Sequence, residues 1–150
     1  MIKKIYIGSD HAGYETKEAL QKYLAKKGIE TIDLGTHDKK RVDYPDIAEK
    51  VSRKVAKDKG SFGLLVCGTG IGMNISANKI KGIRAANPYD NYTAKMARQH
   101  NDANVICVGG RTYDLVKAKK ILGAFLKAKP SKEKRHINRI KKISKIEKKN

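Results

Sequence analysis

The sequence has few cysteines and no long apolar run. Only Cys67 and Cys107 occur among 150 residues, without a C-x-x-C pair or a Cys/His cluster at metal-ligand spacing. A disulfide framework and a zinc site are therefore not expected. No apolar run approaches the roughly 20 residues that a helix needs to cross a bilayer. The first eight residues resemble a short strand rather than a signal peptide. We therefore expect a cytoplasmic protein that contacts no membrane.

Acidic residues are also scarce, because 15 Asp and Glu stand against 34 Lys and Arg, which gives a net charge of +19. Such a charge attracts anions, whether polyanions or small anionic substrates, and does not choose between them. The excess is uneven, since residues 127–150 hold eleven Lys and Arg and two Glu. A nucleic-acid-binding function would therefore depend mainly on this tail.

Apolar runs rich in β-branched residues alternate along the chain with stretches of helical spacing. The apolar runs cover residues 2–7, 31–34, 62–67, 83–86 and 104–108, and the helical stretches cover 14–27, 46–57, 72–79, 89–99 and 114–126. This alternation predicts one α/β domain over residues 1–150, a Rossmann-like three-layer sandwich whose five-stranded parallel sheet has helices on both faces. Ligands bind such sheets at the carboxyl ends of the strands, so the loops after the strands are the expected site.

The tail after Pro130 has isoleucines at positions 137, 140, 143 and 146. This spacing predicts a basic C-terminal helix over about residues 131–148 with one apolar stripe, which needs a surface to pack against. Arg135 and Arg139 stand four residues apart and share a helix face, where two guanidinium groups can bind one phosphate. In so basic a segment that spacing also arises easily by chance.

Asp10 and His11 follow the first apolar run, within Gly8-Ser9-Asp10-His11-Ala12-Gly13. In one interpretation Asp10 or Ser9 caps the next helix and His11 is incidental. In the other, the carboxylate and the imidazole act on one ligand at the end of a strand. This segment alone leaves both open.

Cys67 ends the third apolar run and precedes the glycine-rich segment Gly68-Thr69-Gly70-Ile71-Gly72. Glycines let backbone amides approach an anion, and the start of the next helix adds a partial positive charge. The same field increases the thiolate fraction of Cys67, and a thiolate can serve as a base. The segment matches neither the dinucleotide-binding fingerprint nor a P-loop. Cys67 could instead be a core residue, as we expect for Cys107, but its place beside three glycines favours the chemical role.

His100 precedes the fifth apolar run, in the segment Arg98-Gln99-His100-Asn101-Asp102, and Arg111 follows that run. Taken alone, His100 is best explained as a residue at the C-terminus of a helix, where it interacts with the helix dipole. Asn101 is then expected to be the left-handed cap.

Taken together, these segments resemble the type B ribose-5-phosphate isomerases of the ribose/galactose isomerase family, over nearly the whole chain. The resemblance is carried by GSDHAG at 8–13, DYP at 43–45, CGTGIG at 67–72, ANK at 77–79, RQHNDANV at 98–105 and the two arginines of RHINR at 135–139. Two departures are Ser9, where many relatives have cysteine, and the lysine-rich C-terminus.

The resemblance implies an enzyme without metal or cofactor that interconverts ribose 5-phosphate and ribulose 5-phosphate through a cis-enediolate. Cys67 would move the proton between C1 and C2, while Thr69 and the loop amides stabilise the enediolate oxygen. His100, assisted by Asp10, would open the furanose ring. The remaining roles that it implies are hydroxyl positioning by Tyr44 and Asn101, further substrate contacts from Gly68, Gly70, Ile71 and Gly72, and phosphate binding by His11, Arg111, Arg135 and Arg139.

One branch of the family uses a glutamate as the base, and the matching residue here is Met73. A thioether accepts no proton at neutral pH, so the resemblance indicates Cys67. It further implies a homo-oligomer, a dimer or a tetramer, whose active sites take residues from two subunits. The C-terminal helix would then pack at the subunit interface.

Two alternatives remain open at this point. The first is an isomerase of a six-carbon sugar phosphate, allose 6-phosphate or galactose 6-phosphate. The galactose 6-phosphate enzyme divides these motifs between two different subunits, whereas this chain carries both sets. The second is a basic module that binds RNA or other polyanions, which leaves Cys67 and His100 without a role. We expect no specific nucleic-acid partner.

Overall fold

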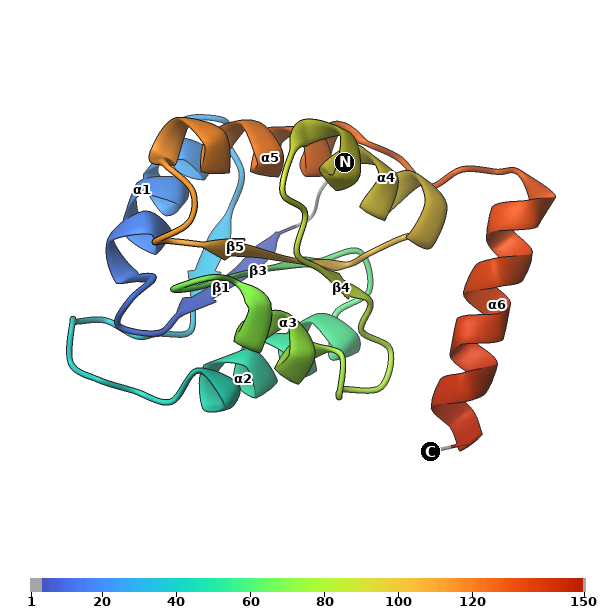
Figure 1. The fold of residues 1–150 in the computed structure, drawn as a ribbon, viewed down its shortest axis with the longest axis horizontal. Helices are drawn as coiled ribbons and strands as arrows, with labels where there is room; N and C mark the ends of the chain where they lie inside the picture. The colour runs from blue at the N-terminus through green and yellow to red at the C-terminus, as the bar shows by residue number, and fades with distance from the viewer. Residues whose placement is uncertain (1–3, 150) are drawn as a thin grey trace.

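A computed structural model describes residues 4–149, and in it five parallel strands form one sheet (Figure 1). The strands are paired in the order β2-β1-β3-β5-β4. Their bounds are β1 Ile5–Ser9, β2 Thr31–Asp33, β3 Phe62–Cys67, β4 Ala85–Ala86 and β5 Val105–Gly109. This confirms the predicted parallel sheet. The predicted start of the first strand, at residues 2 and 3, lies outside the described residues.

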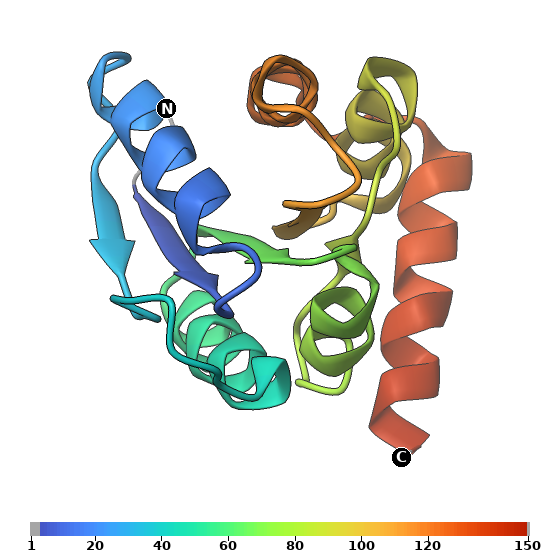
Figure 2. The same ribbon diagram turned by 60° about the vertical axis from the view of Figure 1, so that its left-hand side comes forward.

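Helices cover both faces of the sheet. Their bounds are α1 Tyr14–Ala25, α2 Tyr44–Lys57, α3 Ile71–Ala77, α4 Asn91–Asn101, α5 Leu115–Lys127 and α6 Lys134–Lys149. Figure 2 shows α1, α5 and α4 on one face, α2 and α3 on the other, and α6 apart from these layers. The three-layer Rossmann-like sandwich that the sequence predicts is thus confirmed.

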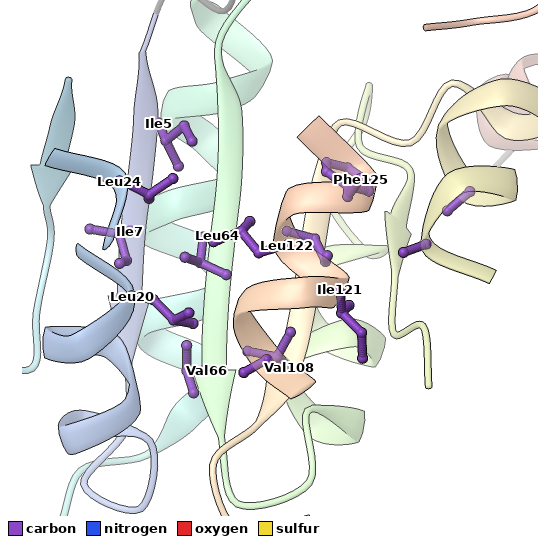
Figure 3. Close-up of a cluster of buried hydrophobic side chains, with 14 of the residues drawn as sticks. Ile5, Ile7, Leu20, Leu24, Leu64, Val66, Val108, Ile121, Leu122 and Phe125 are labelled. Atoms are coloured by element: carbon purple, nitrogen blue, oxygen red, sulfur yellow. The ribbon is translucent and has the colours of Figure 1, made fainter. Parts of the chain in front are cut away.

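Alternation along each strand divides the core into two clusters. Ile5 and Ile7 of β1 point to the cluster under α1, α4 and α5, whereas Tyr6 between them points to the cluster under α2 and α3. Figure 3 shows the first cluster, in which Leu64 of β3 lies among side chains from both neighbouring strands and from the helices. Because successive side chains of a strand face opposite ways, strands buried on both faces must be apolar throughout.

β4 is shorter than the predicted run at 83–86, and side chains bond its free side and the residue before it. The side-chain amide of Asn78 bonds both the N–H and the carbonyl of Ala85, at 2.9 and 3.0 Å. The N–H of Arg84 donates to the side-chain oxygen of Asn104 at 2.9 Å instead of joining the ladder. Asn78 thereby closes the free edge of the sheet.

The helices begin and end within a few residues of the predicted positions, and local capping explains two of the differences. α2 begins at Tyr44, two residues early, with Pro45 in its first turn, where a missing N–H has no cost. α4 begins two residues late, at Asn91, because Asp90 and Thr93 form a capping box.

α6 confirms the predicted C-terminal helix but does not present one packed apolar stripe. Side chains three residues apart are displaced by about 60° around a helix, so the isoleucines wind about its axis. Ile137, Ile143 and Ile146 are 38, 41 and 62% exposed, and His136 is the one buried residue in α6. Within residues 4–149 no helix is long and apolar enough to cross a membrane.

The central strand provides a test of the core. Leu64 is fully buried, whereas Val116 in α5 is 63% exposed. We expect Leu64→Ala to lower the free energy of unfolding by about 2–5 kcal/mol, because it removes buried apolar contacts and leaves a cavity. Val116→Ala should change it by less than about 0.5 kcal/mol. Chemical denaturation measures both, and equal effects of the two substitutions would contradict the described core.

Candidate active site

The loops after β1, β3 and β5 meet at the carboxyl edge of the sheet. The N–H of Asp10 donates to the carbonyl of Val66 at 3.1 Å, and the N–H of Gly110 donates to the carbonyl of Cys67 at 2.7 Å. One residue further, the N–H of Arg111 donates to the carbonyl of Gly68 at 2.9 Å. These bonds bring the segments that begin at Asp10, Cys67 and Arg111 together, at the edge where the sequence predicts the site.

Cys67 is the last residue of β3, and its thiol is held by the glycine-rich segment 68–72, which we call the glycine loop. The N–H of Gly70 donates to Sγ of Cys67 at 3.1 Å, and the cysteine is 4% exposed. Gly70 has a φ of +81°, and a Cβ there would lie 2.4 Å from Nδ2 of Asn87. Only glycine fits this position without strain.

Cys107 is a core residue, as the sequence predicts. It is wholly enclosed on β5, and burial raises the pKa of its thiol well above the usual value, with nearby Cys67 adding to the shift. A thiol of this kind stays protonated and inert. The two cysteines therefore differ in environment, and only Cys67 ends a strand beside the glycine loop.

Two further candidates lie against the glycine loop. A Cβ on Gly72 would meet the ring of Tyr44 at 2.6 Å, so the ring lies directly over this glycine. A Cβ on Gly68 would lie 3.5 Å from Cδ of Arg111, so that side chain passes over the loop. The hydroxyl of Thr69 is exposed and accepts the N–H of Ile71 at 3.2 Å.

Asp10 and His11 occupy the end of β1. The carboxylate of Asp10 is buried and accepts the N–H of Gly13 at 2.9 Å, so it holds the turn into α1 although Gly13 is the N-cap residue. Nδ1 of the half-buried His11 accepts the N–H of Val42 at 3.4 Å, which leaves Nε2 as the proton-carrying nitrogen of the neutral ring. Ser9 is not a cap, and its buried hydroxyl has no hydrogen-bond partner among residues 4–149.

His100 and Asn101 lie at the amino edge of the sheet, where the strands begin. They end α4, and the carbonyl of Asn104 just beyond them accepts the N–H of Gly63 at the beginning of β3. Cys67 stands four residues further along β3, or about 13 Å at the usual rise of a strand. The expectation that Asn101 is the left-handed cap is wrong, because Asp102 has that conformation, with a φ of 45°.

α6 lies beside this second edge, at the opposite end of the sheet from the carboxyl ends of the strands (Figure 1). The ring of His136 stacks on the ring of His100, with centroids 4.2 Å apart and planes 9° from parallel. Nε of Arg135 pairs with Oε2 of Glu133 at 2.7 Å, and Arg139 is exposed.

The candidates therefore form two groups, and one copy of the chain does not bring them together. The carboxyl-edge group comprises Asp10, His11, Tyr44, residues 68–72, Arg111 and Cys67. The amino-edge group comprises His100, Asn101, Arg135 and Arg139. His136 stands between Arg135 and Arg139 in the sequence and joins this group through its contact with His100, although no role was predicted for it. Within residues 4–149 no three His, Cys, Asp or Glu side chains are placed to hold a metal ion.

The chain is similar to known proteins over nearly its whole length. A family model described as Ribose/Galactose Isomerase matches residues 5–143. The chain is 42% identical over 146 residues to ribose-5-phosphate isomerase B of Escherichia coli, covering 97% of each chain.

Two solved structures have the same fold. The Clostridium thermocellum ribose-5-phosphate isomerase B has a TM-score of 0.94 at 46% identity, covering 97% of this chain and 98% of that one. The Mycoplasma genitalium ribose-5-phosphate isomerase B, solved with bound ribulose-5-phosphate, has a TM-score of 0.93 at 40% identity, covering 98% and 97%.

These similarities define the protein as an enzyme of the isomerase class. The chain belongs to the ribose/galactose isomerase family, and within it to the group that resembles the type B ribose-5-phosphate isomerases.

The stacked histidines predict how stability depends on pH. Burial lowers the pKa of His136, and His100, Arg135 and Arg139 lower it further, while Glu133 opposes them. The folded state therefore binds a proton at His136 less readily than the unfolded state, whose histidines titrate near pH 6.5. The stability that neutral His136 contributes is complete above that pH and is lost as the pH falls through the lowered value.

We expect the melting temperature to fall by several degrees between pH 7.5 and 5.5, and the fall to be smaller in His136→Gln. His37→Gln is the control: the side chain of His37 is 71% exposed, and its Nδ1 lies 3.8 Å from Oδ2 of Asp33. Differential scanning fluorimetry across this pH range measures the three profiles. Identical profiles for the wild type and His136→Gln would contradict the prediction.

Proposed function

We propose that this enzyme interconverts D-ribose 5-phosphate and D-ribulose 5-phosphate in the cytoplasm, in the non-oxidative branch of the pentose phosphate pathway, without a metal. One observation carries the proposal: Cys67 lies at the carboxyl edge with the N–H of Gly70 on its sulfur. The exposed hydroxyl of Thr69 is two residues away. A related protein of the same fold was solved with ribulose-5-phosphate.

In the proposed reaction Cys67 is the base. Its thiolate removes the proton from C2 of the open-chain aldose, which leaves an enediolate with its charge on O1, and then returns that proton to C1. The hydroxyl proton of O2 passes to O1, so that C2 becomes the carbonyl of the ketose and C1 its hydroxymethyl group. The N–H of Gly70 donates to this sulfur at 3.1 Å, so a hydrogen bond is already in place for the thiolate that the reaction requires. Met73 is fully buried and has no acid–base chemistry, so it does not replace Cys67.

The charge of the enediolate is stabilised by donors fixed before the reaction begins. The hydroxyl of Thr69 accepts one bond from Ile71 and still has its own hydrogen to donate to the substrate. Amides of the glycine loop add further donors, in an arrangement of the oxyanion-hole type. In the proposal, Tyr44 over Gly72 contacts the sugar hydroxyls, and His11 and Arg111 bind the phosphate.

The amino-edge group completes the site from a second copy of the chain. His100 would act as the acid and base that opens the ring, with Asp10 across from it, while Asn101, Arg135 and Arg139 bind the sugar and its phosphate. A two-fold pairing supplies each amino-edge group to the other copy and so forms two equal sites.

Exposed apolar surface on α6 supports this pairing. Ile143 and Ile146 line a cavity of about 620 Å³ whose opposite wall includes Ile83 and Ala97. This cavity and the exposed isoleucines are a surface that a second copy would cover. In the proposal α6 therefore packs at the interface of a homo-oligomer.

The direct test is turnover of ribose 5-phosphate in excess EDTA. We expect rapid formation of ribulose 5-phosphate by the wild type and a loss of about 10²–10⁴-fold or more in Cys67→Ala, as for removal of a catalytic base. Cys107→Ala is the matched control, with activity per folded molecule near that of the wild type.

Near-normal turnover by Cys67→Ala would contradict the assigned base. If the wild type isomerises only allose 6-phosphate or galactose 6-phosphate, the five-carbon substrate is wrong while the chemistry stands. A requirement for metal, visible as inactivity in EDTA and recovery on adding a divalent cation, would contradict the mechanism.

A further inference from the structure

Lys17 in α1 is a fully buried lysine that the proposed reaction does not use. Its Nζ lies 2.5 Å from Oδ2 of Asp33 and donates to the carbonyl of Thr36 at 2.8 Å, and a carboxylate oxygen of Glu18 lies 3.3 Å away. Burial of an ammonium group is costly unless it is paired and hydrogen-bonded, and here it is both. We refer to Lys17 with Asp33 and the Thr36 carbonyl as the Lys17 clamp.

The clamp fixes the turn that follows β2. The other carboxylate oxygen of Asp33 accepts the N–H of Gly35 at 2.9 Å, so one side chain bonds both Lys17 and the turn. The turn is bonded in its own right to the end of β1: the N–H of Ser9 donates to the carbonyl of Gly35 at 2.7 Å, and the N–H of Thr36 donates to the carbonyl of Ser9 at 2.8 Å. Ser9 directly precedes Asp10 and His11, so the clamp holds the backbone beside them.

The same turn begins the loop that contacts the His11 ring. From Thr36 the chain runs without helix or strand to α2 at Tyr44, and within this loop the N–H of Val42 donates to Nδ1 of His11. The loop is anchored by the clamp at its start and by α2 at its end. An exposed ion pair between Lys39 and Glu15 also joins it to α1, and such pairs contribute little.

We infer that Lys17 is a positioning residue for the phosphate subsite, because it fixes the start of the loop in which Val42 orients the imidazole of His11. The inference rests on the proposed function, which places His11 on the substrate phosphate. The substitution of Lys17 should affect phosphate binding and not proton transfer, since the thiol of Cys67 is held by Gly70 in a different loop. Loss of the clamp therefore weakens phosphate binding and leaves proton transfer nearly unchanged.

Lys17→Met tests this inference, because methionine has an unbranched side chain of similar length without a charge. We expect KM for ribose 5-phosphate to rise about ten-fold, equivalent to about 1.4 kcal/mol of binding, with kcat per folded molecule within about three-fold of the wild type. The dissociation constant for inorganic phosphate, measured by calorimetry, should rise by the same factor as KM. Asp33→Asn keeps the acceptor for Gly35 while weakening the ion pair, and should shift both constants less, in the same direction.

Tyr6→Phe is the matched control. Tyr6 is the second residue of the same strand β1, and its hydroxyl donates to Asp58 at 3.0 Å on the face away from α1. Its loss should lower the melting temperature and leave KM and phosphate affinity unchanged. A purely structural role of Lys17 would give this same pattern in Lys17→Met, which would overturn the inference.

Failure of the inference and failure of the proposed function are distinguishable. Wild-type protein without turnover on ribose 5-phosphate would contradict the function, and the phosphate affinities of wild type and variants would still decide the role of Lys17. If Lys17→Met does not fold, Asp33→Asn decides alone. Phosphate affinity of Asp33→Asn equal to that of the wild type would then overturn the inference.

Discussion

Parallel pairing of β1, β3 and β5 is the constraint on which the rest of the structure depends. Their register sets Ser9 beside Val66 and Cys67 beside Gly109, so three loops leave the sheet at one edge and bond to one another there. The thiol, the glycine loop, His11 and Arg111 are close in space because these strands end together. Two further contacts fix the outer strands of the same sheet. The side chain of Asn78 bonds the free side of β4, and the Lys17 clamp holds the turn that follows β2.

The same constraint separates the other half of the proposed site. A helix between two parallel strands must return the chain to the edge from which the next strand starts, so α4 carries His100 and Asn101 away from Cys67. His136 then stacks on His100 and ties α6 to that edge. In the proposed function a second copy resolves the separation, because a two-fold pairing can place one edge against the other and cover the exposed isoleucines of α6.

The fold and the carboxyl-edge group were predictable from sequence, because alternating apolar runs are a local signal and parallel strands end together. The two-group division follows from the predicted place of His100 at the C-terminus of a helix, because such a helix ends where the next parallel strand starts. The motifs taken by themselves do not separate the two ends of the sheet. Lys17 was not predictable, since a lysine in an amphipathic helix is ordinarily exposed and its partner Asp33 lies in another element. The cap at Asp102 was missed because Asn and Asp both adopt the left-handed conformation.

A mixture of two inactive variants decides whether the active site is shared between two copies. Cys67→Ala and His100→Asn are unfolded together, refolded and assayed on ribose 5-phosphate. With random pairing, half of the dimers contain both variants and have one intact site of two, so we expect about one quarter of wild-type activity. Each variant refolded alone should remain inactive. If the mixture also stays inactive, while wild type treated in the same way recovers, the active site does not take Cys67 from one copy and His100 from another.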